Sequence, residues 1–160
     1  MKKLIQFTIA ILLGINLFVS CAVNKTALGI ADYINHEILN IAELENKALE
    51  RYASVTGENY TTDHKIYEEL NGYVIPVYKR FLDSLRNINP DNKEIRALHS
   101  IYIHGSESIY NGFKIKISGI RSNNIPIIKQ GNKKIEKGRI ETERWRDQLM
   151  SLYDKYGIKQ

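Results

Sequence analysis

Cysteine and histidine, the side chains that most often bind metals or act as nucleophiles, are scarce in this 160-residue sequence. Helical proteins that hold two metal ions use Glu-x-x-His pairs on facing helices, and no histidine here has a glutamate three residues before it. His99 and His104 are five residues apart, which places them on different faces of a helix rather than at the i, i+4 spacing of a metal pair. We therefore predict no metal site and interpret all four histidines as surface residues: His36, His64, His99 and His104.

Motifs for nucleophilic catalysis and cofactor binding are also absent from the sequence. There is no glycine-rich phosphate loop, no Gly-x-Ser-x-Gly turn and no Cys-x-x-Cys-His run that would hold a covalent haem. The single cysteine, Cys21, leaves no disulfide to form. We predict a protein that is not an enzyme, with no catalytic residue and no cofactor, because no nucleophile is matched to a base.

Cys21 follows a segment with the three parts of a secretory signal. Two lysines give a charged start, residues 4–18 are mostly apolar, and the small Ser20 precedes the cysteine. This arrangement resembles the lipobox of bacterial lipoproteins, in which the cysteine is acylated and becomes the first residue of the mature chain. The resemblance implies lipid attachment at Cys21, with palmitate among the chains, and anchoring of the protein to membrane lipid on the periplasmic or cell-surface face.

Two other interpretations of this segment remain open. Cleavage after Ala22 would release a chain without cysteine, since small residues also stand one and three places before that bond. Retention as a membrane helix is disfavoured, because the apolar run is shorter than the roughly 20 residues that span a bilayer. All three interpretations place residues 26–160 outside the cytoplasm.

The chain divides into a signal peptide (1–20), a lipidated tether (21–31) and one helical domain (32–160). The tether has no apolar pattern and would let the domain stand clear of the membrane. Alternatively, Leu28 and Ile30 dock on the domain and shorten the tether. Loss of two lysines with the signal lowers the formal net charge from +5 to +3. This surplus is too small to indicate nucleic-acid binding, and we predict no nucleic-acid partner.

Apolar residues in the domain recur in steps of three and four, the pattern of amphipathic helices. Gly57 and Gly157 are typical helix stops, Asn89-Pro90 is a typical start, and Pro76 predicts a bend near residues 72–75. The pattern predicts four helices: Asp32 to Val55, Thr62 or Asp63 to Ile88, Pro90 to Arg121, and Ile125 to Tyr156.

Glycines recur every seven residues in the last two helices, as Gly105, Gly112 and Gly119 in one and Gly131 and Gly138 in the other. Each glycine inside a helix costs about 1 kcal/mol relative to alanine. Heptad spacing keeps them on one face, so we expect the two helices to pack closely there. Alternatively, Gly105 and Gly119 divide their helix into two pieces.

The fold class that follows is all-α: an antiparallel up-down four-helix bundle with long helices. A coiled hairpin of two or three helices that dimerises is the alternative. The sequence from 62 to 157 also resembles small helical lipoproteins of bacteria, and this resemblance brings no catalytic residue. The residues that carry it are Tyr67-Glu68-Glu69-Leu70, Ile75-Pro76-Val77-Tyr78, Leu98-His99 with Tyr102, and Trp145-Arg146.

A basic stretch is the strongest charge feature, because no acidic residue lies between Ser108 and Ile135. The up-down topology places the turns 57–62 and 121–126 at the end far from the anchor, so this stretch would form a basic tip for an anionic partner. Alternatively, acidic residues of the first two helices face it. The basic residues are Lys114, Lys116, Arg121, Lys129, Lys133 and Lys134; the acidic ones are Glu43, Glu45, Glu50, Glu58, Asp63, Glu68 and Glu69.

An aromatic set offers a second candidate site between the helices: Tyr78, His99, Tyr102, Tyr110 and Trp145. Aromatic residues at helical spacing are more often core than pocket. The favoured function is therefore a non-enzymatic, membrane-anchored lipoprotein of the cell envelope that binds another envelope protein or a polymer. The alternative is a helical bundle that binds a small ligand or a metal.

Overall fold

The computed structural model describes residues 24–158, and every regular element in that range is helical, which confirms the all-α class. Cys21, the signal segment and the alternative cleavage after Ala22 lie outside the described residues. The π-helical segments are η1 and η3, and η2 is a 3-10 turn. In chain order the elements are α1 (Lys25–Asp32), η1 (Tyr33–Ile38), α2 (Leu39–Ala53), η2 (Gly57–Asn59), α3 (Asp63–Glu69), η3 (Leu70–Val74), α4 (Ile75–Asn87), α5 (Lys93–Arg121) and α6 (Ile125–Tyr156).

The first helical run begins seven residues earlier than the pattern predicts. Asn24 caps it, because its side-chain oxygen accepts hydrogen bonds from the backbone N–H groups of Thr26 and Ala27. Ile30 is fully buried, whereas Leu28 is 58% exposed. Residues 25–31, which the sequence assigned to the tether, are therefore helical. They dock on the domain through Ile30, whereas Leu28 points to solvent.

The second run opens at the predicted cap, where the Thr62 side chain accepts a hydrogen bond from the backbone N–H of Lys65. Its regular helix is interrupted just before Pro76, where η3 widens the turn into a π-helix. Proline has no N–H to donate and crowds the preceding turn, and a π-helical turn is one way to accommodate that defect. The interruption falls where the sequence predicts a bend.

The start of α5 differs from the prediction, because the helix begins after Asn92 rather than after Asn89. The Asn92 side chain accepts hydrogen bonds from the backbone N–H groups of Glu94 and Ile95. Its amide also donates to the Thr26 hydroxyl of α1 at 3.3 Å. This tertiary contact joins the cap to another helix and favours the later of the two asparagines.

The boundaries of the last helix agree with the prediction. The Asn124 side chain caps α6 by accepting from the backbone N–H of Ile127, and Pro126 occupies the first turn. Gly157 ends the helix in the left-handed conformation, at φ 64°, which glycine adopts without steric cost.

The glycine prediction is confirmed at the α5–α6 interface, where the backbones touch. A Cβ atom built on Gly112 would lie 2.7 Å from the Ile135 nitrogen, and one on Gly138 would lie 2.5 Å from the Gly105 carbonyl oxygen. On Gly119 it would lie 2.6 Å from the nitrogen of Ile128. These distances are too short for any side chain, so glycine alone permits this approach, and α5 continues through all three of its glycines.

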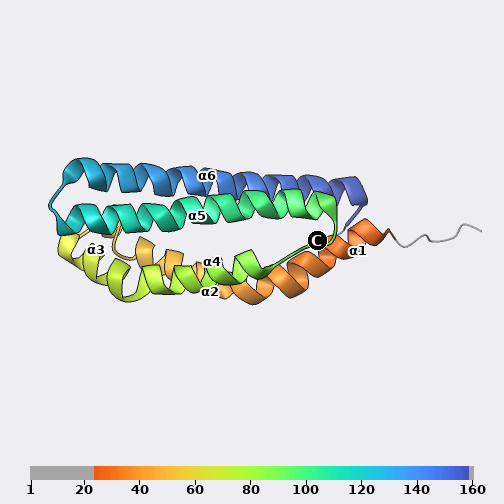
Figure 1. Cartoon of the computed structure of the whole chain (residues 1–160), viewed down its shortest axis with the longest axis horizontal. Helices are drawn as coiled ribbons and strands as arrows, with labels where there is room; N and C mark the ends of the chain where they lie inside the picture. Colours follow the sequence, from red (N-terminus) through yellow and green to blue (C-terminus); the bar gives the residue numbers. More distant parts are fainter. Residues whose placement is uncertain (1–23, 159–160) are drawn as a thin grey trace, which may run out of the picture.

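Figure 1 shows the helices lying along one axis, with α5 beside α6 and α2 beside α4. The α5–α6 turn and α3 lie at one end, which we call the distal end, and α1 lies at the other, the proximal end. The core between the two pairs is aromatic and aliphatic. Its largest fully buried side chains are Tyr78, Phe81, Phe113, Ile30, Leu70, Leu82, Leu85, Ile95 and Ile109.

Candidate functional site

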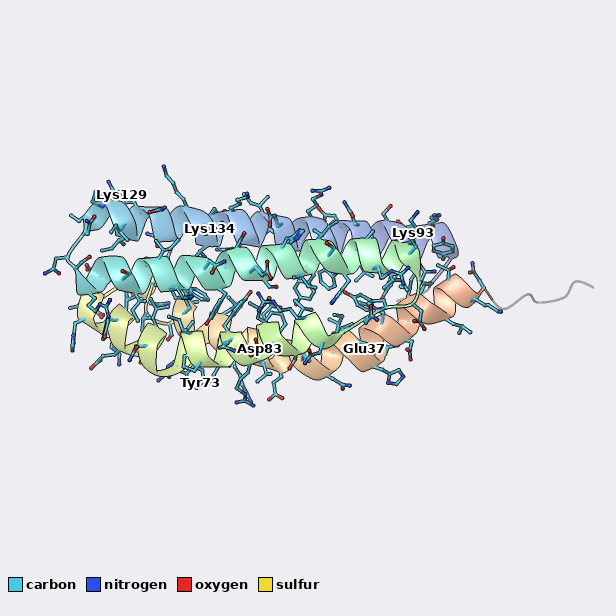
Figure 2. All side chains as sticks on the ribbon, in the orientation of Figure 1. Glu37, Tyr73, Asp83, Lys93, Lys129 and Lys134 are labelled. Atoms are coloured by element: carbon cyan, nitrogen blue, oxygen red, sulfur yellow. The ribbon has the colours of Figure 1, made fainter. Side chains whose placement is uncertain are left out.

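Five basic side chains lie on the distal parts of α5 and α6, and we call them the distal basic surface. Figure 2 shows Lys129 and Lys134 on the part of α6 nearest the α5–α6 turn. Lys134 is half-buried and the other four are exposed. Within residues 24–158, none of the five lies within 4.0 Å of a carboxylate. The members are Lys114, Arg121, Lys129, Lys133 and Lys134.

Three of the seven acidic residues that could face this surface have basic partners on α2 and α3: Glu43, Glu68 and Glu69. Glu43 pairs with Lys47 at 2.6 Å. Glu69 pairs with Arg51 at 2.6 Å and with Lys65 at 2.9 Å, and these hydrogen bonds lower the pKa of the Glu69 carboxyl. Glu50, Glu58 and Asp63 form no ion pair among the described residues. None of the seven acids lies within 4.0 Å of the distal basic surface, so the direct pairing that the sequence left open is not formed.

Lys116, the sixth basic residue of the predicted tip, belongs to the core instead. It is 6% exposed, and its ammonium group donates a hydrogen bond to the Tyr52 hydroxyl at 2.8 Å. Burial lowers the pKa of Lys116, and the charge of Asp63 opposes that effect. Its place on the inner seam of α5 agrees with the helical pattern, but it cannot contribute to a surface site.

A shallow groove of about 520 Å³ runs along the outer side of the α5–α6 pair. Lys114 and Lys134 supply its cationic groups, and Asn111, Gln130 and Ser118 supply amide and hydroxyl groups. Two isoleucines complete its lining, and no carboxylate lines it among the described residues. The groove is thus a hollow within the distal basic surface where residues of both helices meet. Its lining suits an anion that also carries uncharged polar groups.

The aromatic candidates are core residues, as the sequence favoured. Tyr78, His99, Tyr102 and Trp145 are buried. Tyr102 stacks on Trp145 with ring centroids 4.1 Å apart. Tyr110 is half-buried, and the Lys114 ammonium lies 5.5 Å from its ring centroid. The set therefore forms packing between the helices and does not line a shared pocket.

The structure places His99 in the interior, so its assignment to the surface was wrong. Its Nε2 lies 3.1 Å from the Leu85 carbonyl oxygen and its Nδ1 lies 3.0 Å from the Tyr33 hydroxyl. A neutral imidazole fits both contacts, because Nε2–H donates to the carbonyl and Nδ1 accepts from the tyrosine. Burial lowers the pKa of His99, which is consistent with a structural, uncharged ring.

Glu45 is half-buried, and the sequence did not predict its contacts with the core tyrosines. Its carboxylate accepts hydrogen bonds from the hydroxyl of Tyr78 at 3.5 Å and from the hydroxyl of Tyr102. Burial raises the pKa of Glu45, although both tyrosines and the charge of Arg146 act in the opposite direction. Its spacing could have indicated this position, because Glu45 stands four residues after Ile41 and therefore lies on the inner face of α2.

A second hollow lies at the proximal end, with a volume of about 530 Å³. It is formed by α1, η1 and the loop before α5, and three of its lining residues are acidic: Asp32, Glu37 and Asp91. Asp32 also lies 3.9 Å from His36 on its outer side. In residues 24–158, no three His, Cys, Asp or Glu side chains converge as a metal site would require.

None of the described helices combines the length and the apolar character needed to cross a bilayer. No family model, no curated protein and no solved structure matches the chain.

Proposed function

We propose that this chain is a non-enzymatic, lipid-anchored protein of the cell envelope that binds an anionic polymer at its distal basic surface. Its scaffold would be the antiparallel up-down four-helix bundle expected from the sequence. The observation that carries the proposal is the charge distribution. Five basic side chains lie on the distal parts of α5 and α6 with no carboxylate within 4.0 Å among the described residues, while Glu43, Glu68 and Glu69 pair with basic residues of α2 and α3. Unpaired charge of one sign attracts partners of the opposite sign.

The position of this surface supports a binding role away from the membrane. Three residues separate Cys21 from the start of α1, so lipid attached there would hold the proximal end. A helix of 32 residues, such as α6, is about 48 Å long. The distal basic surface would then face outward, where polymers of the envelope are accessible.

Polymer binding is tested with the detergent-solubilised full-length protein and polygalacturonate, a soluble polycarboxylate. The variant Lys129→Gln/Lys133→Gln should bind at least several-fold more weakly at low salt, because it removes two of the five cations. The matched control Lys25→Gln/Lys93→Gln removes the same charge at the proximal end and should bind like the wild type. Added salt should weaken wild-type binding, since exposed charges are screened over about 10 Å at 0.1 M. Equal loss in both variants would show non-specific attraction and contradict the proposal.

The lipid anchor is tested separately by cell fractionation. Cys21→Ser removes the only sulfur that could carry a thioether-linked lipid, so the protein should leave the membrane fraction and change its processing. Ser20→Ala keeps a small residue before the cysteine and should remain in that fraction. Unchanged sedimentation of the Cys21→Ser protein with the envelope would refute lipid anchoring.

A second candidate function, binding of a small ligand, is favoured by the proximal hollow alone. Its volume of about 530 Å³ falls within the range of small-molecule sites, and its three carboxylates would suit a cationic ligand. Native mass spectrometry of the purified protein tests this candidate. A reproducible added mass that Asp32→Asn/Asp91→Asn abolishes would support it over the polymer.

A further inference from the structure

We infer that the α5–α6 groove recognises a saccharide unit that carries acidic groups, so the anionic polymer is a glycan rather than a plain polyanion. This inference rests on the proposed function and names the class of partner for the same surface. Its basis is the kind of polar groups that accompany the two lysines of the groove.

Two carboxamides distinguish the groove from a simple patch of charge. The side chains of Asn111 and Gln130 have no hydrogen-bond partner within residues 24–158. A carboxamide offers both two donors and an acceptor, which matches a sugar hydroxyl that donates and accepts. A bare phosphate or carboxylate needs donors only, and Lys114 and Lys134 already supply them. The hydroxyl of Ser118 adds a third uncharged polar group.

Other anionic partners fit this lining less well. Single-stranded nucleic acid is held by aromatic side chains on which the bases stack, and the described lining residues of the groove include no aromatic ring. Embedding in a bilayer surface uses a broad apolar face beside the cations, whereas the groove offers only two isoleucines between polar groups. Purely electrostatic contact with an anionic bilayer needs only the lysines and would leave the two carboxamides unused. A polysaccharide with hydroxyl and acidic groups would contact the lysines, the carboxamides and the serine of the groove.

The backbone that carries the groove is also held in a fixed geometry. Gly112, Gly119 and Gly131 fix α5 and α6 in backbone contact directly beside it. Because the two helix backbones are held at a fixed separation, only side chains have to be ordered when a ligand binds, which favours specificity. A flexible loop bearing the same residues would not provide this advantage.

Two polymers separate hydroxyl recognition from charge. Polygalacturonate carries carboxylates on sugar rings, and polyacrylate carries carboxylates without hydroxyls. Binding of each to the full-length protein is measured by isothermal titration at low salt, together with binding to vesicles of phosphatidylglycerol. The variant Asn111→Ala/Gln130→Ala should bind polygalacturonate about tenfold more weakly, as expected for two lost hydrogen bonds, with its affinity for polyacrylate unchanged. Asn46→Ala, an exposed amide on α2, is the control and should change neither.

The outcomes distinguish this inference from the function on which it rests. If the wild type binds both polymers equally and the double variant changes neither, the saccharide inference is wrong while polyanion binding stands. The lipid anchor alone would insert into any bilayer, so neutral phosphatidylcholine vesicles serve as the reference. If the wild type prefers phosphatidylglycerol to phosphatidylcholine vesicles and Asn111→Ala/Gln130→Ala leaves binding to polygalacturonate unchanged, the partner is a lipid surface and the inference is overturned. If the wild type binds neither polymer, the proposed function and the inference both fail.

Discussion

Helix α5 packs against α6 on one side and against α2 and α4 on the other, in opposite ways. Toward α6 it presents glycines, and the two backbones meet without intervening side chains, as at Gly138 and the Gly105 carbonyl oxygen, where an added Cβ would lie 2.5 Å away. Toward α2 and α4 it presents the aromatic and aliphatic core, with a few polar groups among its apolar side chains. Tyr102 and Lys116 there donate hydrogen bonds to Glu45 and Tyr52 of α2.

The difference indicates what each interface does for the protein. Backbone contact fixes the separation of α5 and α6, and with it the shape of the outer groove. The interface with α2 and α4 contains ionisable groups whose pKa values are displaced by burial, in Glu45, His99 and Lys116. We therefore expect steric substitutions to damage the first interface and changes of charge to tune the second.

The largest effect is expected from adding one methyl group to the α5–α6 interface. In Gly138→Ala the new Cβ would lie 2.5 Å from the Gly105 carbonyl oxygen and 2.7 Å from the Ile109 nitrogen. Because these are backbone atoms, the helices must separate, and we expect a loss of about 2 to 3 kcal/mol in unfolding free energy. Gly72→Ala, which meets nothing within 4 Å, should instead stabilise by about 0.5–1 kcal/mol. Urea denaturation measures both, and equal stability would show that the close approach is absent.

A smaller effect is expected from removing the hydrogen-bond acceptor of the buried lysine. Tyr52→Phe should cost about 1–2 kcal/mol, because the Lys116 ammonium would lose its hydrogen bond of 2.8 Å. Adding Lys116→Met should recover most of that loss, since an apolar side chain of similar length needs no partner. Tyr67→Phe, at a half-buried tyrosine of α3, is the control. A double variant as unstable as Tyr52→Phe would contradict the role assigned to the lysine.

The pH dependence of stability tests the carboxylate between the two tyrosines. Burial raises the pKa of Glu45 above its ordinary value of 4.5, so ionisation opposes folding. Its contribution to stability is fully present below pH 4.5 and is lost as the pH rises through the raised value. Each tenfold change in its dissociation constant corresponds to about 1.4 kcal/mol. Glu45→Gln should therefore gain stability relative to the wild type between pH 4 and pH 7 in denaturant titrations. Glu50→Gln, on the exposed face of α2, should show no such trend.

The sequence predicts the helices and the glycine interface well because both depend on regular spacing. Apolar residues and glycines at helical intervals fall on one face whatever the partner, so the buried side of α5 could be read from Ile95 to Ile120. The start of α5 could not. Asn89 and Asn92 both satisfy the local rule for a cap, and the contact between Asn92 and Thr26 exists only in the folded chain.

The polar interior was harder to predict, because charged residues are usually exposed. Glu45 is in phase with Ile38, Ile41 and Ala48, but its charge placed it among the acidic residues expected on the surface. His99 was assigned to the surface for the same reason. Its partners, Tyr33 and the Leu85 carbonyl, come from other helices. Partners of this kind depend on how the helices are rotated against each other, which sequence spacing does not reveal.

The distal basic surface should give the smallest effect on stability, and this contrast sharpens the comparison of the two interfaces. Lys129 and Lys133 are exposed and have no carboxylate within 4.0 Å among the described residues. Lys129→Gln/Lys133→Gln should therefore change the unfolding free energy by less than about 0.5 kcal/mol, and relief of repulsion favours a slight gain. Thermal unfolding monitored by circular dichroism checks this, with Lys25→Gln/Lys93→Gln alongside. A loss of more than about 1 kcal/mol would mean that these lysines hold the fold together, and their charge could then no longer be attributed to binding.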